Sequence, residues 1–184
     1  MTKPSSLKSR LVRMMAVTVL ITSAIGGISF AINSTTVSAA RATTADIKLN
    51  QAQAVQRFHR LFKDAQVTEI TLEPKGNRYQ YQIDGFDKEQ EYTAVINAKT
   101  GKIRWSHSTK LDYDDKYYAL DLDKTISRQD ATKLAENETK QGKAQRWKLE
   151  NDDGQQTWEV DVIDGHHTTE VKINALTKDI INDN

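Results

Sequence analysis

The chain contains an internal repeat, which limits the folds open to it more than any other sequence feature. The segment Asn97-Ala98-Lys99-Thr100-Gly101-Lys102-Ile103 has a counterpart 77 residues later in Asn174-Ala175-Leu176-Thr177-Lys178-Asp179-Ile180. Residues 49–54 match residues 126–131 at the same distance. Two matches at one spacing indicate a structural unit that occurs twice. We therefore predict repeat units at residues 48–107 and 125–182.

Between these matches the alignment is less regular. The pattern Tyr79-x-Tyr81-x-Ile83 resembles Trp158-x-Val160-x-Val162 at a distance of 79, and Asp84-Gly85 resembles Asp164-Gly165 at a distance of 80. This alignment predicts small insertions in the loops of the second unit. It also makes the two Asp-Gly pairs equivalent turns, because Asp-Gly is a common turn dipeptide.

Each unit is predicted to begin with a helix. In the first, Asn50 and Gln53 have the spacing of a helix cap. In the second, Ser127 and Asp130 form a more typical capping box, and Gly142 is placed to end the helix. The apolar face of the second helix is narrower, so we expect it to be the weaker one. The apolar residues are Ala54, Phe58, Leu61, Phe62 and Ala65 in the first helix, and Ala131, Leu134 and Ala135 in the second.

After each helix the hydrophobic period changes from 3.6 to 2, which is typical of strands with one buried face. We predict the α+β class, with a helix packed on an antiparallel β-meander in each of two tandem units. A unit of about 60 residues buries only around 60% of its unfolded surface, so the two units should pack together. The alternation places Trp105, Trp147 and Trp158 in the core, in preference to a carbohydrate-stacking surface.

Residues 108–124 form an acidic connector. Its aspartates alternate with leucine and tyrosine, which predicts a segment that lies across the surface. An irregular cation site around Asp112, Asp114 and Asp115 is the alternative to a solvated linker. The segment from Asp121 begins like a calcium loop, but Ile126 stands where that loop needs glycine, which argues against an EF-hand.

Residues 1–39 have the organisation of a secretory signal. A basic start that ends at Arg13 precedes an apolar stretch over residues 14–32, and small residues follow. Cleavage after Ala39 or Ala40 fits the small-residue rule. A retained membrane anchor is the alternative, since the apolar stretch is long enough to cross a bilayer. Both interpretations place the rest of the chain outside the cytoplasm, as a secreted or cell-envelope protein.

Composition and missing motifs exclude several functions. The chain has no cysteine, which removes disulfides, thiol nucleophiles and zinc fingers. Without the four basic residues of the signal, 22 basic residues face 25 acidic ones, a balance that does not suit nucleic acid. Neither a Gly-x-Ser-x-Gly elbow nor a phosphate-binding glycine loop is present.

One segment approaches a metal-binding motif. His167 and Glu170 have a zinc-protease spacing, but Val171 replaces the second histidine, so we interpret His166 and His167 as turn residues. We therefore predict no catalytic residues, no metal, no cofactor and no small-molecule substrate.

The repeat residues resemble those of the PepSY domain, the peptidase propeptide and YpeB domain. That pattern has a capped helix, an aromatic-x-aromatic-x-aliphatic strand that closes on Asp-Gly, and a strand that runs into Asn-Ala-x-Thr-Gly-x-Ile. The second unit departs from it at Lys178, which stands where Gly101 stands in the first, and this puts an equivalent last turn in question. The residues that carry the resemblance are Tyr79, Tyr81, Gly85, Asn97, Ala98, Thr100, Gly101, Trp158, Gly165, Asn174, Ala175 and Thr177.

The resemblance implies a non-catalytic exported module that binds a protein and modulates or inhibits extracellular or cell-envelope proteases. The alternative is a membrane-tethered structural or sensory protein that binds wall polymer or another envelope protein. In that case the N-terminal segment stays in the membrane.

Overall fold

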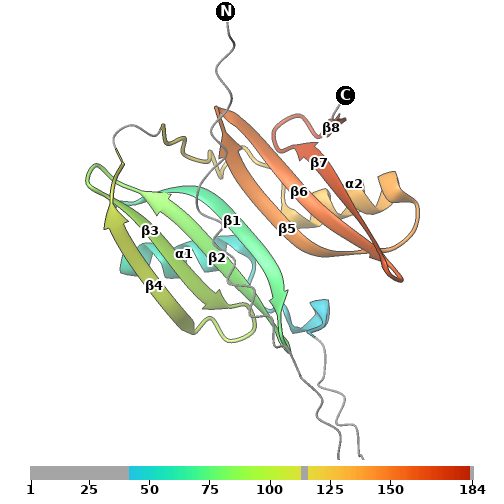
Figure 1. Ribbon diagram of the computed structural model, residues 1–184, viewed down its shortest axis with the longest axis horizontal. Helices are drawn as coiled ribbons and strands as arrows, with labels where there is room; N and C mark the ends of the chain where they lie inside the picture. The colour runs from blue at the N-terminus through green and yellow to red at the C-terminus, as the bar shows by residue number, and fades with distance from the viewer. Residues whose placement is uncertain (1–41, 113–115, 183–184) are drawn as a thin grey trace, which may run out of the picture. The chain divides into compact units, whose positions relative to one another are not determined.

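The computed structural model describes residues 42–112 and 116–182, which belong to one compact unit, Ser38–Asn184 (Figure 1). The predicted signal segment, its cleavage residues Ala39 and Ala40, and the connector residues Asp114 and Asp115 lie outside the described residues.

The described elements form two successive sets of one helix and four strands. A short 3-10 helix, η1 (Thr44–Asp46), precedes the first set. The first set is α1 (Gln51–Leu61), β1 (Gln66–Lys75), β2 (Arg78–Phe86), β3 (Gln90–Asn97) and β4 (Ile103–Lys110). The second is α2 (Arg128–Thr139), β5 (Lys143–Asp152), β6 (Gln155–Asp164), β7 (His167–Asn174) and β8 (Ile180–Ile181). The predicted α+β class with antiparallel strands is confirmed.

All strands of the described residues belong to a single eight-stranded sheet in the order β4-β3-β2-β1-β5-β6-β7-β8. The two sets meet where β1 pairs with β5, with Ile70 opposite Leu149 and Leu72 opposite Trp147. All four of these side chains are buried. Because opposite residues share a face, the apolar sides of both halves lie on one face of the sheet. Both α1 and α2 cover that face, and neither lies on the other, the open face of the described sheet (Figure 1).

The helix ends differ from the prediction in detail. The complete capping box is in α1, where Asn50 accepts a hydrogen bond from the Gln53 amide and its own amide donates to Gln53. In α2, the Ser127 hydroxyl accepts from the Asp130 amide and donates to the Asp130 carboxylate instead. The left-handed residue that ends α2 is Lys140, not Gly142.

The buried face of α1 is also shifted. It consists of Ala54, Val55 and Phe58, whereas Leu61 is 41% exposed. The helix ends at Leu61, so the longer apolar stripe predicted from the sequence does not continue as a helical face. Phe62 still packs on the sheet, where its ring stacks on Tyr92 at 4.4 Å between centroids.

The last turn of the second half has the same geometry as that of the first. Lys178 has a φ of 74° and Gly101 a φ of 71°, and each amide donates to the carbonyl of the asparagine four residues earlier. The glycine-to-lysine replacement therefore leaves the turn unchanged. It places a side chain in the left-handed region, which costs about 1–2 kcal/mol.

Lys178→Gly should therefore stabilise the protein by about 0.5–1 kcal/mol, since part of the gain offsets the greater flexibility of unfolded glycine. Urea unfolding of the full chain measures this difference. The matched variant, Gly101→Lys, should destabilise it, because its Cβ would also lie 3.3 Å from Leu49. A Lys178→Gly protein less stable than the parent would contradict the turn geometry.

Candidate interaction surface

The residues predicted to mark the repeat serve the fold. The hydroxyl of Tyr81 donates to the Leu49 carbonyl at 3.0 Å, and the indole N–H of Trp158 donates to the Ile126 carbonyl at 3.1 Å. Each partner of the second pair lies 77 residues after its counterpart in the first, and both rings are buried. Each ring lies on a strand and hydrogen-bonds to a backbone carbonyl in the segment just before a helix. Trp158 is thus the counterpart of Tyr81, and the predicted alignment at a distance of 79 is wrong.

The same correction applies to the Asp-Gly pairs. Gly85 lies inside β2, opposite Val67, and Val162 holds the corresponding place in β6, opposite Ala144. Gly165 lies in the turn between β6 and β7, with a φ of 59°. A constant spacing of 77 therefore relates the strands of the two halves, and the predicted insertions are absent between these positions.

The asparagines of the repeated segment organise tight turns. The side-chain oxygen of Asn97 accepts hydrogen bonds from the amides of Lys99 and Thr100, and that of Asn174 accepts from Leu176 and Thr177. The alanines that follow, Ala98 and Ala175, are fully buried. Their amides donate to the carbonyls of Tyr79 and Gln156.

Tyr79 joins the two halves on the helix side of the sheet. Its hydroxyl donates to the carbonyl and to the side-chain oxygen of Gln145, at 3.0 and 2.8 Å. Its ring also lies 6.2 Å from that of Trp147. The repeat signature is therefore used inside the structure, and a binding surface has to be sought elsewhere.

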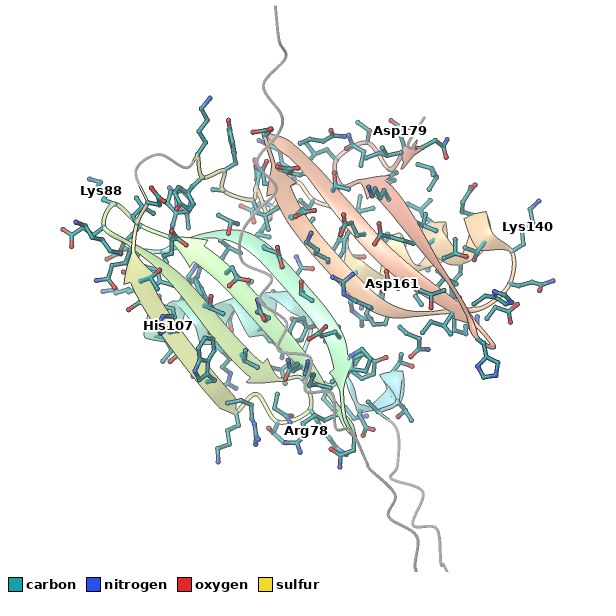
Figure 2. All side chains as sticks on the ribbon, viewed as in Figure 1. Arg78, Lys88, His107, Lys140, Asp161 and Asp179 are labelled. Atoms are coloured by element: carbon teal, nitrogen blue, oxygen red, sulfur yellow. The ribbon has the colours of Figure 1, made fainter. Side chains whose placement is uncertain are left out.

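The open face of the sheet carries a band of charge across the β1–β5 junction. Glu69 lies opposite Asp84 on β2 and Glu150 on β5. Lys148 is the nearby cation, with its Nζ 2.7 Å from Glu150 and 3.3 Å from Glu159. Asp161, labelled in Figure 2, continues the band on β6.

These carboxylates are held where ionisation is unfavourable. Burial, followed by the charge of Asp84, raises the pKa of Glu69 to about 7, although Lys148 and a hydrogen bond from Thr71 oppose the shift. Burial likewise raises the pKa of Asp84 and of Glu150. The band is therefore a pH-sensitive part of the surface.

Strand β4 carries an aromatic pair, Trp105 and His107, of which the sequence interpretation placed Trp105 wrongly in the core. Trp105 is 53% exposed, whereas Trp147 and Trp158 are buried as predicted. The pairing of β3 with β4 runs from Ile96 opposite Ile103 to Val95 opposite Trp105, so Arg104 is an extra residue that forms a β-bulge. The bulge turns Trp105 to the open face. There its ring stacks on that of His107, 5.6 Å away with an interplanar angle of 17°. Figure 2 labels His107 on β4.

The connector packs against both halves. The Leu120 amide donates to the Val67 carbonyl on β1, and Asn151 on β5 donates its side-chain amide to the Ala119 carbonyl. A hollow of about 480 Å³ lies beside this segment, with His59 and Asp121 among its lining residues. Asp121 is paired with Lys124 at 2.6 Å, so this carboxylate already has a cation.

The polar residues of the segment that approaches a zinc motif, His166, His167 and Glu170, are all exposed. His166 occupies the β6–β7 turn and His167 begins β7. Val171 is buried in the core, on the opposite side of the strand from Glu170. Within residues 42–112 and 116–182, no group of three histidine or carboxylate side chains is placed to hold a metal ion. No helix in these ranges has the length and apolar character to span a membrane.

The fold defines a class of small α+β domains in which one helix packs on an antiparallel sheet and a repeated Asn-Ala segment forms the last turn. Comparison with known families assigns the chain to such a class. The peptidase propeptide and YPEB domain, PepSY, matches residues 48–104 and 125–184. The chain belongs to the PepSY family, with two copies of the domain. Curated proteins gave no significant match.

A solved structure shares the fold. It is the crystal structure of a Clostridium difficile 630 protein described as a putative lipoprotein, with a TM-score of 0.67 and 23% sequence identity. The match covers 74% of this chain and 92% of that protein.

Proposed function

We propose that this protein is a non-catalytic, exported binding module that modulates a protease outside the cytoplasm. The observation that carries the proposal is the double match to a domain of peptidase propeptides. The geometry supports it, because the signature residues are used in the fold and an exposed strand, β4, is left at the sheet edge. A module of this kind recognises its partner through shape and strand-edge contacts, without a reacting group.

The test is capture of secreted proteins from the source organism on the immobilised full chain, followed by activity titration of any protease retained. We expect the protein to slow the protease and to keep its intact mass, which separates inhibition from competition as a substrate. His166→Ala/His167→Ala should inhibit equally well, because both side chains are exposed and belong to no group of three candidate metal ligands within the described residues. Capture of wall polymer or a membrane sensor, with no protease, would contradict the proposal.

A second candidate is a membrane-tethered envelope protein. The description of the Clostridium difficile 630 structure as a putative lipoprotein favours an envelope location. This chain has no cysteine for a lipid anchor, so tethering would use the N-terminal apolar segment. Fractionation of cells decides between the two: full-length protein found only in membranes supports this candidate, and a shortened form in the medium supports the first.

A further inference from the structure

Strand β4 offers an unpaired edge. It pairs with β3 along one side, and within the described residues no strand pairs with its other side. Seven of its eight residues are exposed. A row of backbone N–H and C=O groups is therefore available, and such an edge can accept a strand from another chain.

The charge of this edge indicates which kind of strand could pair with it. Arg104 and Lys110 lie near its two ends, and β4 contains no acidic residue. A second copy that pairs its own β4 with this edge would bring only cations to these cations, because β4 contains no acidic residue, and like charges close to one another across a strand pair are destabilising. Acidic side chains would meet both cations favourably.

The aromatic pair adds a second requirement. Trp105 and His107 share the open face, and they would lie beside every second side chain of an added strand. Trp105 is the most exposed of the large apolar side chains in the part of the chain that the structure describes. An apolar side chain on the added strand would cover it.

We propose that β4 binds, by strand addition, an extended segment of another protein that carries acidic residues and an apolar residue facing Trp105. This inference rests on the proposed function in one respect, that the module acts by binding a protein. It adds the surface used and the chemistry of the segment that is recognised.

The experiment titrates labelled peptides into the full chain, kept soluble in a mild non-ionic detergent. The probe alternates glutamate and valine over eight residues, and its controls are the lysine-valine peptide and the glutamate-valine peptide with N-methylated backbone. We expect the glutamate-valine probe to bind, and to shift the fluorescence of the exposed Trp105 to shorter wavelength. Both control peptides should bind at least about tenfold more weakly, since one reverses the charge and the other removes strand hydrogen bonds.

Arg104→Glu/Lys110→Glu should weaken binding of the glutamate-valine probe about tenfold and improve binding of the lysine-valine peptide. The matched control, Lys63→Glu/Lys75→Glu, makes the same charge change at exposed positions away from β4 and should leave the ratio of the two affinities near the parent value. Trp105→Ala should abolish the fluorescence shift.

Equal effects of the two double variants would overturn the proposal, as would equal binding of the N-methylated peptide. Self-association that competes with the probe and is lost in Arg104→Glu/Lys110→Glu would overturn it in favour of a second copy. The titration contains no protease, so its outcome is independent of whether capture retains one. Binding of the probe without a protease target would reject the proposed function and keep the β4 site.

Discussion

Gly85→Ala is expected to destabilise the protein by at least about 3 kcal/mol, because the new methyl group has no space. A Cβ built on Gly85 would lie 2.3 Å from the Gln66 carbonyl oxygen and 3.0 Å from Cζ of Phe58. The first contact is with backbone that is held by the β1–β2 pairing, so it cannot move aside cheaply. Urea unfolding followed by circular dichroism measures the loss.

Gly165→Ala provides the control for that variant. Its Cβ would meet nothing within 4 Å, but its φ of 59° makes any side chain strained, so we expect a loss of about 1 kcal/mol. If the two alanine variants lost equal stability, Gly85 would be a turn residue, as the sequence interpretation had it.

The small volume of Gly85 is compensated by a large side chain on the helix of the same half. Phe58 on α1 fills the space above it, whereas Ala135 on α2 and Val162 on β6 hold the corresponding positions 77 residues later. A large helix residue with a small strand residue is thus replaced by the reverse combination. Volume is preserved, which is the main condition for a well-packed core.

Glu69→Gln should raise stability at pH 8 by up to about 3 kcal/mol and leave it nearly unchanged at pH 4. The folded-state pKa of Glu69 is raised from 4.5 to about 7, so the folded protein retains a proton that the unfolded chain releases. This contribution to stability is present below pH 4.5, falls between pH 4.5 and 7, and is lost above that range. Glutamine keeps an oxygen that can accept the Thr71 hydrogen bond at every pH.

The measurement is urea unfolding of both proteins from pH 4 to pH 8. Glu73→Gln is the matched control, because Glu73 lies on the same strand and face but beyond the four residues that pair with β5. The groups that face Glu69 are Asp84, Glu150, Lys148 and Thr71, and all of them are retained in both variants. Parallel pH curves for the Glu69→Gln and parent proteins would show that this carboxyl ionises normally in the fold.

The sequence by itself identified much of the local structure. The helix starts at Asn50 and Ser127 are set by side chains that accept a hydrogen bond from the amide three residues later, and such contacts depend on neighbours in the chain. The alternation that marked Ile70, Leu72 and Ile83 as buried holds for the same reason, since a strand has a side-chain period of two. The repeated Asn-Ala segment likewise forms the same turn twice, and its family was recognised from it.

The tertiary structure decided what depends on pairing between strands. A β-bulge at Arg104 reverses the alternation along β4 and exposes Trp105, and a bulge is defined by the register of two strands, not by one strand's sequence. Register also determines that Tyr81 and Trp158 hold equivalent positions in the two halves, and that Asp84-Gly85 lies within β2. The junction of β1 with β5 was also not predictable, because it is made by backbone groups that every sequence possesses. This junction places Glu69 between the carboxylates of Asp84 and Glu150.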